Sequence, residues 1–227
     1  LNQSVYSPHI KMSKSLYPKQ LEALRFFLRR LRAGDNTLDQ SDMGTGKTVV
    51  GVKIAKALGR PLSKLVFSGP DDALRDTVNA QPAIMAVSLA CVKAMEEQLG
   101  PEGMPAPAFV AGHSLGEFTA LAVTGVLDVG ETARLVQERG RLMQEACEAN
   151  PGIMAAVIGL DEMTMEEIAR ETGAYVSNIN TAEQIVISGD RMAVVTALDL
   201  ASARGAKKAI PLRVGGAFHS GLMEPAR

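Results

Sequence analysis

The pattern of apolar and polar positions predicts a largely helical first part and a second part in which helices alternate with strands. Between residues 19 and 32, leucine and phenylalanine recur every three or four positions while arginines occupy the opposite face. Such periodicity is typical of an amphipathic helix. Further helices are expected at residues 49–58, 72–78, 81–99, 118–123 and 130–149. Two short apolar runs, at 65–67 and 108–111, predict buried strands.

Residues 153–213 have a pattern of their own. Strands are expected at 153–158, 174–178, 184–188 and 207–212, with helices at 165–171 and 192–204. The order β-α-β-β-α-β is that of a ferredoxin-like unit. Such a unit more often supports a function than supplies its chemistry. The chemistry is therefore sought in the turns on either side of it.

Composition describes an ordinary globular protein. The chain has 227 residues, of which 46% are hydrophobic and 22% are charged, enough for one large domain or two small ones. Its two cysteines, Cys91 and Cys147, have neither metal-ligand spacing nor a disulfide framework. The first 14 residues lack the apolar core of a signal peptide, and no apolar run reaches membrane-spanning length. A reducing, cytoplasmic setting is expected, with no membrane partner.

The two parts of the chain carry opposite charge. Residues 1–64 hold twelve Lys or Arg against four acids, whereas residues 65–227 hold twelve against twenty-one. Opposed charge suggests segments with different partners or histories. The basic head favours phosphates or nucleic acid, and the acidic remainder argues against nucleic-acid binding.

A candidate nucleophile elbow follows the apolar run at 108–111. The sequence Gly112-His113-Ser114-Leu115-Gly116-Glu117 lies between an expected strand and an expected helix. Strand, G-x-S-x-G and helix form the tight turn that lifts a serine hydroxyl above a sheet edge. The N–H groups at the start of the helix can stabilise an oxyanion there. A glycine-rich turn without chemistry is an equally good interpretation of this stretch on its own.

A second glycine-rich stretch, Ser41-Asp42-Met43-Gly44-Thr45-Gly46-Lys47-Thr48, precedes a helical run. Gly44 and Gly46 would let backbone N–H groups wrap a phosphate, Lys47 would reach terminal phosphates, and Thr48 could hold magnesium. With Tyr17-Pro18-Lys19-Gln20 upstream, it resembles the start of a superfamily 2 helicase. That resemblance implies ATP–Mg²⁺ and nucleic acid as ligands, with Gln20 reading adenine.

The second acidic motif of such an ATPase has one candidate in the chain, Asp161-Glu162. The same Asp161 also fits the start of the helix expected at 165–171. No coupling motif or arginine finger context follows it. The P-loop is thus a nucleotide-binding candidate without the rest of its ATPase.

Four motifs over residues 65–227 resemble malonyl-CoA:acyl carrier protein transacylases and the related acyltransferase domains of polyketide synthases. They are Gln81-Pro82-Ala83, Gly112 to Glu117, Glu138-Arg139-Gly140 and Gly216-Ala217-Phe218-His219-Ser220. The ferredoxin-like unit lies between the last two, as in that family. The resemblance implies malonyl-CoA and acyl carrier protein as partners, and no cofactor.

The resemblance also implies a role for individual residues. Ser114 would attack the malonyl thioester, and His219 would be its base, since a serine hydroxyl needs one at neutral pH. Arg139 would pair with the free malonyl carboxylate, for which a planar guanidinium fork is well suited. The N–H of Leu115 is an expected oxyanion donor. Phe218 resembles the malonyl-selecting form of the motif.

The expected fold class is α/β: a partial α/β-hydrolase-like acyltransferase domain with a ferredoxin-like insertion, preceded by a helical P-loop segment. The expected division is 1–64 for the basic helicase-like segment, 65–152 with 214–227 for the large domain, and 153–213 for the small subdomain. Family members begin with a G-Q-G-S-Q loop and continue beyond the histidine motif, so an impaired centre is expected. The alternatives are an ATP-dependent nucleic-acid enzyme and an inactive chimera.

Overall fold

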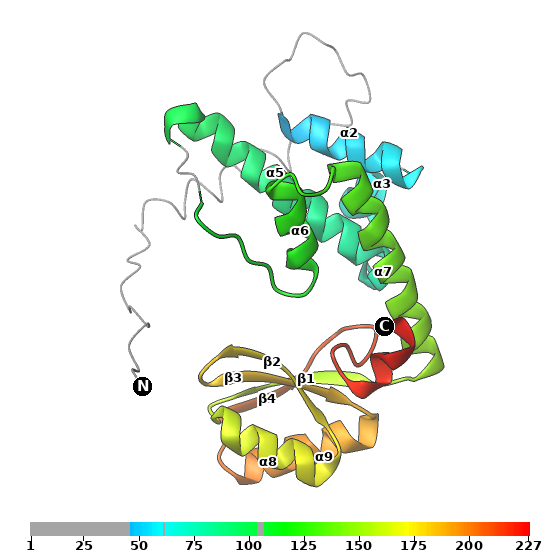
Figure 1. Ribbon diagram of the computed structural model, residues 1–227. Helices are drawn as coiled ribbons and strands as arrows, with labels where there is room; N and C mark the ends of the chain where they lie inside the picture. The colour runs from blue at the N-terminus through cyan, green and yellow to red at the C-terminus, as the bar shows by residue number, and fades with distance from the viewer. Residues whose placement is uncertain (1–45, 61, 104–106) are drawn as a thin grey trace.

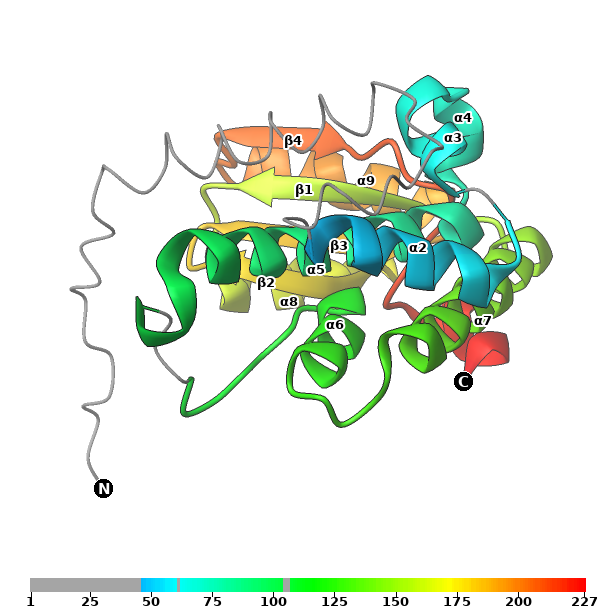
Figure 2. The same ribbon diagram turned by 90° about the horizontal axis from the view of Figure 1, so that it is seen from above.

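The computed structural model describes residues 46–60, 62–103 and 107–227. The helix expected at 19–32, Gln20 and Gly44 therefore lie outside the described residues. Figure 1 shows helices in one half of the molecule and a sheet with helices of its own in the other. Seen from above in Figure 2, the helix α5 (Thr77–Gly103) passes over the sheet. One long helix, α7 (Val129–Ala149), runs from the helical half toward the sheet half.

The helical half consists of six helices among the described residues. They are α2 (Gly46–Leu58), α3 (Leu62–Ser68), α4 (Asp71–Arg75), α5 (Thr77–Gly103), α6 (Leu115–Val123) and α7 (Val129–Ala149). Their buried side chains form one core, to which α2 contributes Val50 and Ile54 alongside Met85 of α5 and Val136 of α7. The helix that follows the P-loop sequence thus packs into the same core as the elbow helix α6.

Both short apolar runs were predicted wrongly as strands. Residues 65–67 lie in the helix α3, which places Leu62 and Val66 one turn apart on the face that packs into the core. A run of three apolar residues cannot distinguish the two structures by periodicity. Residues 108–111 form no strand, since they pair with no other segment among the described residues. Phe109 is 94% exposed there.

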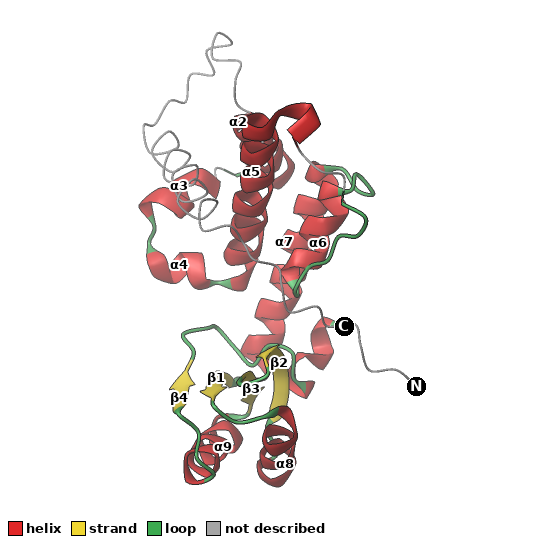
Figure 3. Ribbon diagram, turned by 90° about the vertical axis from the view of Figure 1, so that its left-hand side faces the viewer, coloured by secondary structure: helices red, strands yellow, loops and turns green. Residues whose placement is uncertain are grey.

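The sheet half has the predicted order of elements. It contains β1 (Ile153–Ile158), α8 (Glu162–Thr172), β2 (Tyr175–Thr181), β3 (Gln184–Gly189), α9 (Arg191–Ala203) and β4 (Lys208–Pro211). The strands lie in the order β2-β3-β1-β4, with all neighbours antiparallel. This topology confirms the ferredoxin-like unit. Figure 3 shows α8 and α9 on the face of the sheet away from the helical half.

The start of α8 settles how Asp161 is used in the fold. Its side chain accepts a hydrogen bond from the backbone N–H of Thr164 at 2.8 Å. An aspartate that satisfies an N–H of the first turn is an N-cap. The structure therefore agrees with the helix-start interpretation of Asp161-Glu162.

The segment Thr77–Glu97 of α5 is long and apolar enough, by length and composition, to cross a membrane. The expectation that no apolar run reaches that length was therefore wrong. In the fold, α5 packs against α2, α6 and α7, and its residues Met85 and Leu89 are buried in their common core. A core helix meets the same criteria as a membrane span.

The helices α5 and α7 cross in close contact at Gly140. A Cβ atom at Gly140 would lie 2.7 Å from the carbonyl oxygen of Thr77 and 2.8 Å from Cα of Val78. Since both are backbone atoms, the helices would have to move apart to admit a side chain. Gly140 thus sets the distance between the two longest helices.

We expect Gly140→Ala to lower the free energy of unfolding by about 1–3 kcal/mol, the usual cost of overpacking a core. The control is Gly51→Ala in α2, where an added Cβ meets nothing within 4 Å. Alanine is the better helix former there and should stabilise by up to about 1 kcal/mol. Urea unfolding measures both variants. Equal effects of the two substitutions would contradict the steric explanation.

Candidate active site

The turn that carries Ser114 has the geometry of a nucleophile elbow. Ser114 has φ 53° and ψ −108° and directly precedes α6. Such a backbone conformation costs of order 1–3 kcal/mol in a residue with a side chain. A Cβ at Gly112 would lie 1.9 Å from the carbonyl carbon of Gly116, so only glycine fits at Gly112. The turn is closed by a hydrogen bond of 2.9 Å from the Gly116 N–H to the His113 carbonyl.

His219 reaches Ser114 from the far end of the chain. Its Nε2 lies 3.0 Å from Ser114 Oγ, across 105 residues of sequence. His219 also has a positive φ, 58°. The turn around it is held by Ser220, whose hydroxyl donates to the Ala217 carbonyl at 2.6 Å and accepts from the Leu222 N–H at 3.2 Å. The serine hydroxyl and the imidazole are therefore within hydrogen-bond distance, as a nucleophile and its base need to be.

Arg139 contacts the same serine. Its Nη2 donates to Ser114 Oγ at 3.0 Å, and its Nη1 donates to Gln81 Oε1 at 2.5 Å. Its guanidinium carbon lies 5.6 Å from the centre of the Phe118 ring, within cation–π distance. Gln81 is buried and donates from Nε2 to Thr77 Oγ1 at 2.6 Å. A fixed chain of contacts thus holds the guanidinium beside the serine.

Two of these partners were not predicted as site residues. Gln81 belongs to one of the four family motifs, and that motif was the available signal. Phe118 lies four residues after Ser114, which places it one helical turn away. The contact between Gln81 and Arg139 joins positions 58 apart in the sequence, so the local pattern does not predict it. The same holds for the position of the Phe118 ring beside the guanidinium.

Burial and charge act on the site's titratable groups. The pKa of His219 is lowered by burial, and further by the positive charges of Arg139 and His113, while Glu117 opposes the shift. The rings of His113 and His219 are 6.5 Å apart between centroids. Burial also lowers the pKa of Arg139, against the attraction of Glu117. A neutral imidazole beside a serine hydroxyl can accept its proton.

The remaining predicted site residues lie in different places. Leu115 is the first residue of α6, where N–H groups have no intrahelical partner and are free to face an oxyanion. Phe218 is half-buried and packs against two buried clusters, one of Ala146, Cys147 and Met223 and the other of Met154, Ala156 and Val186. Gly46, Lys47 and Thr48 form the first turn of α2, while Gly44 lies outside the described residues.

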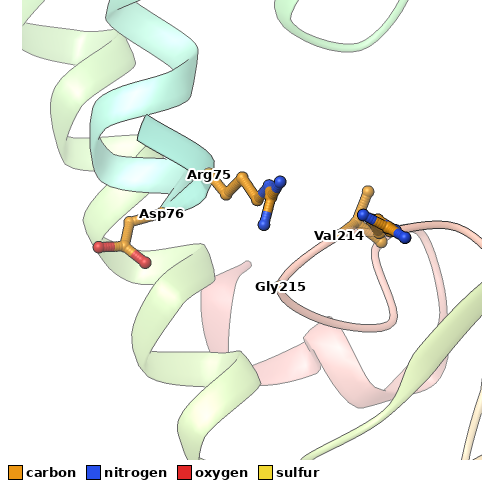
Figure 4. A pocket seen from close by; sticks show the side chains of 5 residues that line it. Arg75, Asp76, Val214 and Gly215 are labelled. Atoms are coloured by element: carbon orange, nitrogen blue, oxygen red, sulfur yellow. The ribbon is translucent and has the colours of Figure 1, made fainter. Parts of the chain in front are cut away.

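A cavity of about 400 Å³ separates the end of α4 from the loop that leads to His219. It is lined by Arg75, Asp76, Arg213, Val214 and Gly215. In Figure 4, Arg75 points across the cavity toward Val214, and Asp76 points away from it. In the described part of the chain, no group of three or more His, Cys, Asp or Glu side chains is placed to hold a metal ion.

A serine on an elbow, with a histidine and an arginine both 3.0 Å from its hydroxyl, is an arrangement suited to a serine nucleophile. The chain belongs to the acyl transferase domain family, whose sequence model matches residues 51–227. That match begins inside the segment interpreted as a helicase-like head. The resemblance of residues 16–64 to a helicase is thus not supported.

The similar proteins are named for one activity. The malonyl CoA-acyl carrier protein transacylase of Bacillus subtilis (strain 168) is 38% identical over 225 residues, which are 97% of this chain and 62% of the relative. That of Escherichia coli (strain K12) is 40% identical over 193 residues, 82% of this chain and 61% of the relative. The chain spans about three fifths of these relatives' length.

Solved structures agree with the sequence comparison. The acyl-carrier-protein-S-malonyltransferase from Bartonella henselae superposes with a TM-score of 0.72 at 45% identity, over 79% of this chain and 58% of that one. A malonyl-transacylase in complex with a type II PKS acyl-carrier protein gives a TM-score of 0.71 at 39% identity, over the same shares. The fold class predicted from the sequence is therefore confirmed.

We expect Gly112→Ala to abolish the reactivity of Ser114 toward a fluorophosphonate probe. The added Cβ collides with backbone atoms of Gly116, and a nucleophile displaced by about 1 Å can lose about 100-fold in rate. Gly116→Ala is the matched control, since its Cβ meets nothing within 4 Å. Probe labelling followed by intact mass measures both. Equal labelling of the two variants would exclude this role for Gly112.

The lowered pKa of His219 predicts how the rate of Ser114 labelling falls as the pH is lowered. The base must be neutral, so a lowered pKa keeps the serine reactive as pH falls below the ordinary histidine value of about 6.5. Because the charge of Arg139 contributes to that shift, Arg139→Met should move the midpoint to higher pH. Labelling rates measured from about pH 4.5 to about pH 8.5, two units either side of the ordinary histidine value, locate this midpoint. A wild-type midpoint above that of the variant would refute the assignment.

Proposed function

We propose that this chain carries the centre that transfers a malonyl group from malonyl-CoA to acyl carrier protein, through an ester on Ser114. The observation that carries the proposal is the double contact of Ser114 Oγ, with His219 and Arg139 each at 3.0 Å. The similar proteins are named for this activity, and one neighbour is in complex with an acyl-carrier protein.

In the first half of the reaction, His219 Nε2 takes the proton of Ser114 as Oγ attacks the thioester carbonyl. The tetrahedral oxyanion forms at the N-terminus of α6, where the Leu115 N–H donates to it. Collapse breaks the carbon–sulfur bond, and His219 returns the proton to the CoA thiolate. In the second half, the carrier protein's thiol attacks the ester with the same proton exchange in reverse. No cofactor enters either half.

Arg139 selects the acyl group in this proposal. Its guanidinium carries five N–H groups, of which one donates to Gln81 and one to Ser114. A carboxylate on the far end of the acyl group can pair with them, and charge-assisted pairs of this kind are about twice as strong as neutral ones. An acetyl group offers no such partner, so malonyl is preferred.

The proposed division of the chain keeps 153–213 as a small subdomain and joins 65–152 to 214–227 in the large one. The helix α2 packs on the large part. The two free cysteines, one exposed and one buried, fit the proposed cytoplasmic setting. The ATP-dependent alternative has less support, because the acyl transferase match begins at residue 51, inside the segment on which that alternative rests.

We expect incubation with malonyl-CoA to give a malonyl adduct on the intact protein, and Ser114→Ala to give none. Arg139→Met should reduce the adduct at least about tenfold, the value of one charged hydrogen bond. Arg141→Gln is the control, because Arg141 pairs with Glu138 and Glu145 on the outer face of α7. Intact mass is the readout, since a slow centre still accumulates its ester. An adduct that persists in Ser114→Ala would rule out the proposed nucleophile.

A further inference from the structure

The contact between Arg139 and Ser114 has a consequence beyond substrate binding. Nη2 of Arg139 donates to the oxygen that must attack the thioester. We propose that Arg139 holds Ser114 in a less reactive state until a carboxylate of the acyl substrate takes the Nη2 hydrogen, so that the substrate itself releases the nucleophile. This gate rests on the proposed function and adds a second role for Arg139.

The direction of the hydrogen bonds fixes the resting state. A guanidinium has only donors, so Ser114 Oγ must be the acceptor from Arg139. The hydroxyl hydrogen is then available for His219 Nε2, 3.0 Å away. Oγ has two lone pairs, and Arg139 occupies one of them. A hydrogen bond from a cation draws electron density from the oxygen and weakens it as a nucleophile.

A carboxylate competes well for this hydrogen. Its hydrogen bond with a guanidinium is charge-assisted on both sides, whereas the serine hydroxyl is neutral. The arginine does not need to leave its place to make the exchange, since Gln81 holds Nη1 and the Phe118 ring lies against the guanidinium. The contact to Ser114 is therefore the one that a bound carboxylate replaces.

Electrostatics acts in the same direction. Attack requires His219 to become an imidazolium, and the positive charge of Arg139 lowers the pKa of His219. A carboxylate on Arg139 neutralises that charge and makes His219 a stronger base. Of the other groups that face His219, His113 acts like Arg139 and Glu117 opposes it, and neither contacts Ser114 Oγ. Substrate binding thus improves both the nucleophile and its base.

With this gate, Arg139 discriminates between acyl groups by the rate at which Ser114 is acylated as well as by the strength of substrate binding. An acyl thioester without a carboxylate leaves Arg139 on Ser114, even when its carbonyl reaches the elbow. Interactions that appear only when the right substrate is bound discriminate between substrates in the acylation step. An acetyl group would therefore be transferred slowly at saturating concentration too.

The test uses phenylmethanesulfonyl fluoride, a neutral reagent that modifies serine and carries no carboxylate. Its rate of reaction with Ser114 is followed by intact mass, with and without free malonate, and Ser114→Ala confirms the site. We expect malonate to accelerate modification of the wild type by about tenfold, the equivalent of one charged hydrogen bond. If no gate existed and malonate only competed with the reagent for the site, malonate would slow the modification of Ser114 instead.

Two variants separate the gate from simple occupancy. Arg139→Met should react faster than wild type without malonate and should not respond to it. Arg141→Gln, altered two residues away on the outer face of the same helix, should respond as wild type does. Slower modification in malonate, no response to it, or a slower reaction of Arg139→Met would each overturn the gate.

The outcome is independent of malonyl transfer. Malonate acceleration without a malonyl adduct from malonyl-CoA would refute the proposed function and leave the gate standing. An adduct from malonyl-CoA without acceleration by malonate would support the proposed function and overturn the gate.

Discussion

The close crossing of α5 and α7 at Gly140 is the contact on which the geometry of the site depends. Gly140 lies against the Thr77 carbonyl, and its neighbour Arg139 then reaches Gln81, one turn further along α5. Gln81 is itself held by the Thr77 hydroxyl. Two helices that pack backbone to backbone therefore deliver an arginine to a fixed point, although its own side chain is long and flexible.

The same helix α7 also positions the base. Near its C-terminal end, Cys147 packs against Gly216, where a Cβ atom would lie 2.1 Å from the Cys147 sulfur. Gly216 is three residues before His219, so the loop that carries the histidine docks on the helix that carries the arginine. Phe218 fills the space beside this contact, between the helices and the sheet. One helix thus sets the positions of Arg139 and His219 relative to each other.

Pattern alone predicted the sheet half more closely than the helical half. The first strand, 153–158, agrees with β1, which has four consecutive buried residues and pairs with β3 on one side and β4 on the other. Residues 65–67 and 108–111 are equally apolar, yet neither finds a strand partner among the described residues. Local hydrophobicity predicts that a segment is buried, but the segments that pair or pack with it decide whether it forms a strand or a helix.

The candidate site residues were predicted from the family motifs and not from the periodicity of apolar positions. Ser114 and His219 are 105 residues apart, and no local rule joins them. The charge contrast between the two parts of the chain was a poorer guide. The basic segment before residue 64 contributes Val50 and Ile54 to the same core as Ala133 and Val136 of the more acidic remainder. Net charge describes a surface and says little about which segments share a core.

The proposed nucleophile and base share one uncommon feature, a positive φ. Ser114 and His219 each present a side chain from a strained turn that neighbouring backbone holds in place, by the Gly112–Gly116 contact and by Ser220. Their 3.0 Å separation is therefore supported from both sides by turns that the backbone holds in place. Arg139 is the adaptable member, because its hydrogen bond to Ser114 can be exchanged without moving any turn. In the proposed reaction, such a centre keeps its nucleophile and base preorganised, and the response to substrate is left to one guanidinium.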